Sequence, residues 1–139
     1  MIITDQKILR QVSKPFEGSK EELYKIISLL DKELNLSIIP GVGLSAIQIG
    51  IPLQVAIIRT KDLDIDLYNA KIVDCSGLFR FKNEGCLSIP NICKDTWRFN
   101  NITIENKNGS IIKLIGYNSV VVSHEIDHWH GILFTDRLT

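Results

Sequence analysis

The pattern that most constrains this chain lies near its end, in the run HEIDH at residues 124–128. On an α-helix, residues four apart lie about 40° apart around the axis, so the imidazoles of His124 and His128 can converge on one ion. Glu125 is offset by one residue and can reach a water on that ion. The run therefore predicts a metal-binding helix, although two partly buried histidines on a helix also occur by chance. His130 lies about 200° from His128 and cannot share the ion.

A third protein ligand must come from upstream in the chain. No glutamate follows Glu125, and Phe134 stands where a longer version of the motif would place a third histidine. Asp136 is the only acid beyond the run, and it lies close to the chain end. Cys86 is the best candidate, because a thiolate is a strong ligand and EGCLS (residues 84–88) predicts a tight, exposed turn. For Cys75 and Cys93 we expect only small buried side chains.

Composition excludes several classes of protein. With 139 residues, 45% apolar and 23% charged, the chain has the composition of a single soluble globular domain over residues 1–139. A formal net charge of zero argues against direct binding to nucleic acid or to a membrane. No apolar run is long enough for a signal peptide or a membrane span. Three cysteines without a C-x-x-C pair indicate a reducing compartment, so we expect a cytoplasmic protein.

Local patterns predict an α+β fold. A capping box at Ser19 and apolar residues at helical spacing predict an amphipathic helix over residues 20–36. A second helix is expected over residues 118–130, with Gly131 after its end, although three consecutive valines disfavour it. Strands are expected at residues 53–60, 70–74, 102–105 and 111–114, the last two forming a hairpin. We therefore expect small antiparallel sheets packed around a central metal-binding helix, with an N-terminal amphipathic helix.

Three separated stretches carry a resemblance to a known family. GVGLSAIQIG (residues 41–50), EGCLSIP (residues 84–90) and HEIDHWHG (residues 124–131) resemble the three signature motifs of the peptide deformylases, in the family's order and at similar separations. The resemblance implies a metal-dependent hydrolase that removes the formyl group from the N-terminal formylmethionine of new polypeptides and releases formate. It also implies that the metal is bound by Cys86, His124 and His128, with a fourth position open.

The resemblance further assigns roles within the catalytic machinery. Glu125 is expected to take a proton from the attacking water as general base and pass it to the departing amine. The side-chain amide of Gln48 and the backbone N–H of Leu87 are expected to stabilise the oxyanion. Glu84 and Asp127 are expected to orient the loop and the ligands, with Asp127 acting through Arg98.

Three further residues are expected to contact the substrate. Gly43 would let the backbone approach the peptide closely, because glycine has no β-carbon. Val42 and Val121 would meet the substrate, and Val121, one turn before His124, would line an apolar pocket for the methionine side chain. The alternatives are a plain loop glycine and valines that belong to the core.

The resemblance also implies a cofactor and partners. We expect one divalent ion, ferrous iron in the cell, with zinc, nickel or cobalt able to replace it in a purified sample. The expected partners are formylmethionyl peptides and ribosome-associated nascent chains. We expect the protein to be a monomer. The chain lacks the C-terminal helix of many bacterial members and resembles organellar or phage-encoded forms, so an organelle or a host cytoplasm is also a possible location. We expect activity on short peptides without that helix, weak ribosome binding, and solvated Asp136 and Arg137.

Two departures from the motifs and two alternative functions remain. Ser45 stands where the first motif usually has alanine, and Trp129 replaces a usual leucine; we expect both to affect only local packing. A metallopeptidase of another class would share the H-E-x-x-H chemistry, but it would leave the other two motifs unexplained. A catalytically idle homologue would typically have lost a ligand or the base, and this chain has all of them.

Overall fold

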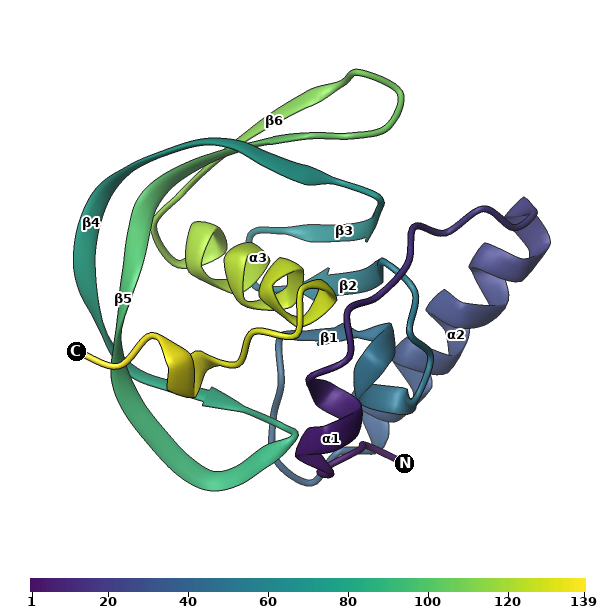
Figure 1. The fold of residues 1–139 in the computed structure, drawn as a ribbon, viewed down its shortest axis with the longest axis horizontal. Coiled ribbons are helices and arrows are strands. Elements are labelled where there is room, and N and C mark those ends of the chain that lie inside the picture. The colour runs from purple at the N-terminus through teal and green to yellow at the C-terminus, as the bar shows by residue number, and fades with distance from the viewer.

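The computed structural model describes residues 1–139 as an α+β fold with two three-stranded antiparallel sheets (Figure 1). One sheet has the strand order β1-β2-β3 and the other β4-β5-β6. None of the helices combines the length and apolarity that crossing a bilayer requires. In chain order the elements are α1 (Gln6–Leu9), α2 (Lys20–Leu36), β1 (Gly43–Ser45), the 3-10 helix η1 (Ala46–Ile49), β2 (Val55–Arg59), β3 (Asp64–Tyr68), β4 (Lys71–Cys86), β5 (Ile89–Glu105), β6 (Ile111–Ile115), α3 (Gly116–Trp129) and the 3-10 helix η2 (Phe134–Asp136).

Helix α3 lies at the centre of the molecule, between the two sheets (Figure 1). Its three consecutive valines are all buried. Burial of these side chains outweighs their weak helix propensity, because packing contributes more to a helix in a protein than intrinsic preference does. The core around α3 consists of Ala56, Ile58, Leu67, Ala70, Ile102, Ile104, Leu114, Val121, Val122, Ile126 and Trp129.

Strand β2 is buried on both faces. Ala56 and Ile58 face α3, whereas Val55 and Ile57 pack with α2 in a second apolar cluster. This division follows from the alternation of side chains along a strand. Helix α2 begins at the cap Ser19, whose hydroxyl accepts a hydrogen bond from the backbone of Glu22, as the sequence predicted. The first sheet is therefore a middle layer between α2 and α3.

The second sheet is dominated by β4 and β5, which are 16 and 17 residues long. They pair with each other and curve around α3 (Figure 1). Register shifts interrupt the pairing between Ile72 and Asp74, between Phe81 and Glu84, and between Glu84 and Cys86. Such irregularities bend a strand and re-aim its side chains. They bring the end of β4, with Cys86, beside the central helix.

The expected helices and the hairpin are confirmed, but several local features differ from the expectations. The segment expected as a strand at residues 70–74 is only the start of β4, and β1 and β3 were not predicted. Of the turn expected at residues 84–88, only Leu87 and Ser88 form one: Glu84 and Cys86 belong to β4, and Glu84 is buried. Asp136 and Arg137 are not simply solvated: Asp136 pairs with Arg10, and Arg137 donates to Asp127.

Candidate active site

The three expected metal ligands converge in the structure. Cys86 ends β4, whereas His124 and His128 lie one turn apart on α3, and one ligand atom from each falls within 4.8 Å of the others. The Sγ of Cys86 is 3.5 Å from Nε2 of His128. Cys75 and Cys93 are exposed, so the expectation that they are buried is wrong.

The donor set fits a divalent transition metal. One sulfur and two imidazole nitrogens form a set that suits iron, zinc, nickel or cobalt. The Nδ1 of His124 is 2.6 Å from Oε2 of Glu84, which leaves its Nε2 for an ion, the usual arrangement of a metal-binding histidine. Burial lowers the pKa of His128 well below its ordinary value, which leaves its imidazole neutral. A neutral imidazole is the form that binds a metal.

Arg98 on β5 connects the ligands to the sheet. Its Nε donates to Oε1 of Glu84 at 2.8 Å and its Nη1 to Oδ2 of Asp127 at 2.7 Å. Burial raises the pKa of Glu84, but hydrogen bonds from His124 and Arg98 outweigh burial and hold it at about 2. The ionised Glu84 therefore orients His124. Asp127, as the sequence predicted, contacts Arg98.

Glu125 is buried beside the three ligands, with its carboxyl facing β1. Its Oε1 is 3.2 Å from Oγ of Ser45. A β-carbon built on Gly43 would lie 2.6 Å from its Oε2, so Gly43 makes room for this carboxyl. The sequence analysis had instead expected Gly43 to let the backbone approach the substrate closely. Burial raises the pKa of Glu125 to about 7, although the hydrogen bond from Ser45 and the charge of His124 act against it. A carboxyl with such a pKa can take up and release a proton near neutrality.

Gln48 on η1 presents a donor to the same site. Its Oε1 accepts a hydrogen bond from the backbone N–H of Ser45 at 2.9 Å. Because a backbone N–H can only donate, this contact fixes the amide oxygen and turns the nitrogen toward the ligands. Nε2 lies 3.1 Å from Oγ of Ser88 and 3.5 Å from Sγ of Cys86.

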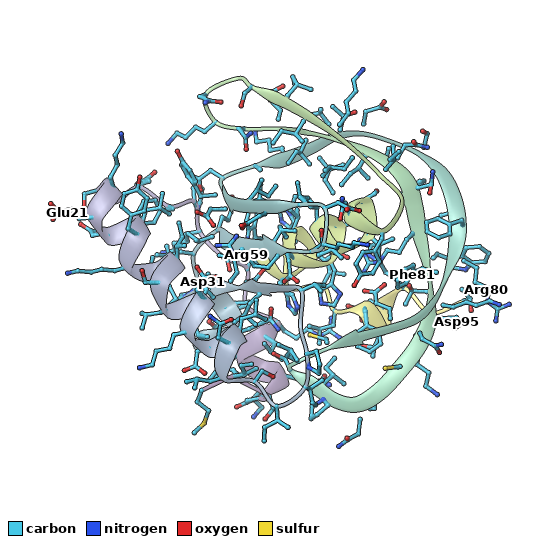
Figure 2. The ribbon with its side chains drawn as sticks, turned by 180° about the vertical axis from the view of Figure 1, so that it is seen from behind. Glu21, Asp31, Arg59, Arg80, Phe81 and Asp95 are labelled. Carbon is cyan, nitrogen blue, oxygen red and sulfur yellow. The ribbon has the colours of Figure 1, made fainter.

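A cavity of about 310 Å³ opens onto these groups. Phe81 on β4 and Tyr117 on α3 form an aromatic wall, with ring centroids 6.2 Å apart. Figure 2 labels Phe81 on the inner side of the curved sheet and Arg80 on its outer side. Every metal ligand, catalytic residue and substrate contact proposed from the sequence lines this cavity except His128: the lining includes Val42, Gly43, Gln48, Cys86, Leu87, Val121, His124 and Glu125.

The sequence analysis missed the aromatic wall and the contacts of Ser45. Tyr117 could have been found, because it precedes His124 by seven residues, which is two helical turns on the same face. Phe81 could not, since its position depends on the irregular pairing of β4. The hydroxyl of Ser45 contacts the backbone and the carboxyl of Glu125, and the sequence analysis, which considered only local packing at this position, did not predict these contacts.

Comparisons with known proteins all find the same family. The family described as polypeptide deformylase matches residues 1–139. "Peptide deformylase 2" of Clostridium acetobutylicum is 38% identical over 142 residues, which cover 99% of this chain and 93% of that protein. A peptide deformylase of Helicobacter pylori strain P12 is 33% identical over 145 residues, covering 96% of this chain and 82% of the relative.

Solved structures share the fold over the whole chain. The crystal structure of peptide deformylase from Thermotoga maritima superposes with a TM-score of 0.88 at 29% identity, covering 100% of this chain and 97% of that one. A probable peptide deformylase from Synechococcus phage S-SSM7 gives a TM-score of 0.85 at 34% identity and covers 99% of both chains.

Proposed function

This chain belongs to the polypeptide deformylase family, and from that membership we propose how its own residues divide the work. The protein is a metal-dependent hydrolase that removes the N-formyl group from newly made polypeptides. Membership of this family excludes the alternative that the protein is a metallopeptidase of another class. The observation that carries the residue assignment is the convergence of Cys86, His124 and His128 within 4.8 Å at the cavity that Glu125 and Gln48 share.

Cys86, His124 and His128 hold one divalent ion in this proposal, and the ion is ferrous iron in the cell. The mixed sulfur and nitrogen donor set supports a first-row metal and also accepts zinc, nickel or cobalt. When bound, such an ion supplies Lewis-acid chemistry, polarising a carbonyl and lowering the pKa of water. Glu84 keeps the Nε2 of His124 directed at the ion through the hydrogen bond on Nδ1.

Glu125 moves the proton. Its Oε2 takes a proton from the attacking water, and the same oxygen then gives it to the amine nitrogen as the C–N bond breaks. The water oxygen joins the formyl carbon, so the products are formate and a free N-terminal amine. The near-neutral pKa of this buried carboxyl supports both transfers.

Two donors stabilise the negative charge that develops on the formyl oxygen. One is Nε2 of Gln48, whose direction is set by the backbone N–H of Ser45. The other is the backbone N–H of Leu87, in the turn that follows Cys86. Such preorganised donors are most effective in a site from which water is excluded.

The cavity recognises the methionine side chain. Val42 and Val121 offer apolar contacts, and the rings of Phe81 and Tyr117 offer the aromatic contacts that a thioether favours. Gly43 keeps the backbone of β1 close to the base. The free thiols of Cys75 and Cys93 fit a reducing compartment, and the protein in this proposal is a monomer acting in the cytoplasm on nascent chains at the ribosome.

The direct test uses anaerobically prepared enzyme and three peptides. Formate should be released from formyl-Met-Ala-Ser, whereas acetyl-Met-Ala-Ser should be a poor substrate and an unblocked longer peptide should not be cut internally. Cleavage of the internal bond would indicate a peptidase. No hydrolysis of any of the three by metal-loaded enzyme would indicate an idle homologue.

A further inference from the structure

Ser45, the last residue of β1, is completely buried between two groups of the site. Its Oγ lies 2.8 Å from the backbone carbonyl oxygen of Glu125 and 3.2 Å from Oε1 of the same residue. No other hydrogen bond reaches the carboxyl of Glu125 within the chain, because the nearby Arg98 is engaged by Glu84 and Asp127. The direction of this carboxyl therefore depends on one hydroxyl.

The hydroxyl of Ser45 has one hydrogen to donate, and two acceptors of Glu125 lie within its reach: the backbone carbonyl oxygen at 2.8 Å and Oε1 at 3.2 Å. Donation to either acceptor holds Glu125 against the end of β1. An alanine, which the first motif usually has at this position, would offer no donor, so the direction of the Glu125 carboxyl in this chain would depend on packing alone.

The backbone of the same residue holds the second group. The N–H of Ser45 donates to Oε1 of Gln48 at 2.9 Å and thereby turns Nε2 of that amide toward Cys86. One buried residue thus contacts both the carboxyl and the amide, through different atoms. The two contacts can be separated by experiment, because a side-chain substitution leaves the N–H in place.

We propose that Ser45 is a positioning residue: its hydroxyl orients the carboxyl of Glu125, and its backbone N–H orients the amide of Gln48. The inference rests on the role of Glu125 proposed above. Small displacements of a catalytic group are costly, and a shift of about 1 Å can reduce a rate by about 10²-fold. Loss of the hydroxyl should therefore lower kcat and leave substrate binding nearly unchanged.

The first measurement compares Ser45→Ala with Ser119→Ala in metal-loaded enzyme. Ser119 is an equally buried serine whose hydroxyl donates to the backbone carbonyl of Phe99 at 2.8 Å, away from the cavity. Ser45→Ala should reduce kcat by about tenfold, keep KM within about twofold and retain one metal per chain. Ser119→Ala should keep both constants. An unchanged kcat in Ser45→Ala would overturn the proposal.

A second pair separates the hydroxyl from the packing. Ser45→Thr and Ser45→Val have the same shape and impose the same extra methyl on a buried site, but only threonine keeps the hydroxyl. Threonine should be the more active by about tenfold, and crystal structures should show one orientation of Glu125 with threonine and several with valine. Equal kcat values and equal order of Glu125 would overturn the proposal even where both variants lose stability.

Coupling to Glu125 completes the test. In a Glu125→Ala background there is no carboxyl to orient, so adding Ser45→Ala should change the residual rate by less than about twofold. A further tenfold loss there would show that the hydroxyl acts elsewhere and would overturn the proposal. If the parent enzyme itself releases no formate, the proposed function fails, and that result is distinct from any of these.

Discussion

Gly43 shows how tightly single residues are fitted at this site. A β-carbon on Gly43 would lie 2.6 Å from Oε2 of Glu125, and one on Gly18 would lie 2.5 Å from Oε2 of Glu22. The two clashes look alike, but their consequences differ. Glu22 is exposed and can move into solvent, whereas Glu125 is buried and held by Ser45.

Gly43→Ala should therefore fold and bind metal while losing about 10²-fold in kcat, because the methyl group displaces the base. Gly18→Ala, whose methyl group meets the exposed Glu22 and the end of the Phe16 ring outside the cavity, should keep its activity. Steady-state kinetics of the two variants provide the comparison. Equal activities in the two variants would mean that the displacement of Glu125 has no effect on the reaction.

Glu125→Gln separates metal binding from proton transfer. The amide is nearly isosteric with the carboxyl, so the variant should keep one metal per chain, but it cannot accept the proton and should lose at least ~10²-fold in kcat. Elemental analysis and initial rates on the same preparation measure both quantities. Near-normal turnover would show that another group is the base.

At the scale of residues, the sequence predicted identities better than contacts. Cys86, His124 and His128 could be proposed because their spacing and chemistry imply a shared ion, and the structure brings them together. The contact of Ser45 with Glu125 joins residues 80 positions apart and depends on how β1 packs against α3. No local pattern in the sequence carries that information.

At the scale of elements, dependence on distant contacts also explains why the strands were predicted less well than the helices. Helix α2 has its own cap and apolar spacing, and its predicted bounds agree with the structure. Strands β4 and β5 alternate poorly and are mostly exposed on one face, and their register shifts depend on pairing with each other. Their length could therefore not be read from either segment alone.

Arg98 is the residue on which three elements depend, since it joins Glu84 of β4 and Asp127 of α3 to its own strand β5. Arg98→Met should lower the free energy of unfolding by about 3–5 kcal/mol, because the buried Glu84 and Asp127 lose the cation that they share, while His124 and Arg137 remain as one partner each. Chemical denaturation of metal-free protein measures this loss.

Arg80 gives the matched control on the same sheet. It faces outward and pairs with Asp95 across the two strands, with 60% of its side chain exposed (Figure 2). Arg80→Met should change the free energy of unfolding by less than about 0.5 kcal/mol, as expected of an exposed ion pair. Similar losses in both variants would contradict the importance given to the buried network.

At the scale of the whole molecule, the N-terminal segment closes over the end of α3. The backbone N–H of Ser13 donates to the carbonyl of Trp129 at 2.8 Å, and Arg10 pairs with Asp136. Gly131 adopts a φ of 72°, and a β-carbon there would lie closer to the carbonyl oxygen of Arg10 than any real contact. The N-terminal segment and the end of α3 thus meet at a glycine.

Gly131→Ala should cost about 2–4 kcal/mol, combining the strain of a left-handed residue with displacement of the N-terminal backbone. Gly109 is the control: its φ is 85°, but nothing lies within 4 Å of its β-carbon position, so Gly109→Ala should cost only about 1–2 kcal/mol. Thermal or chemical unfolding measures both. Equal losses would mean that the contact between Gly131 and Arg10 contributes nothing to stability.

The central claim, that Cys86 joins His124 and His128 in holding a metal, is tested most directly by metal content. Elemental analysis should find one ion per chain in the parent protein and almost none in Cys86→Ala. Cys93→Ala is the matched control, because Cys93 is a free thiol that lines the same cavity without belonging to the ligand set, and it should keep one ion. Stoichiometric metal in folded Cys86→Ala would contradict the account.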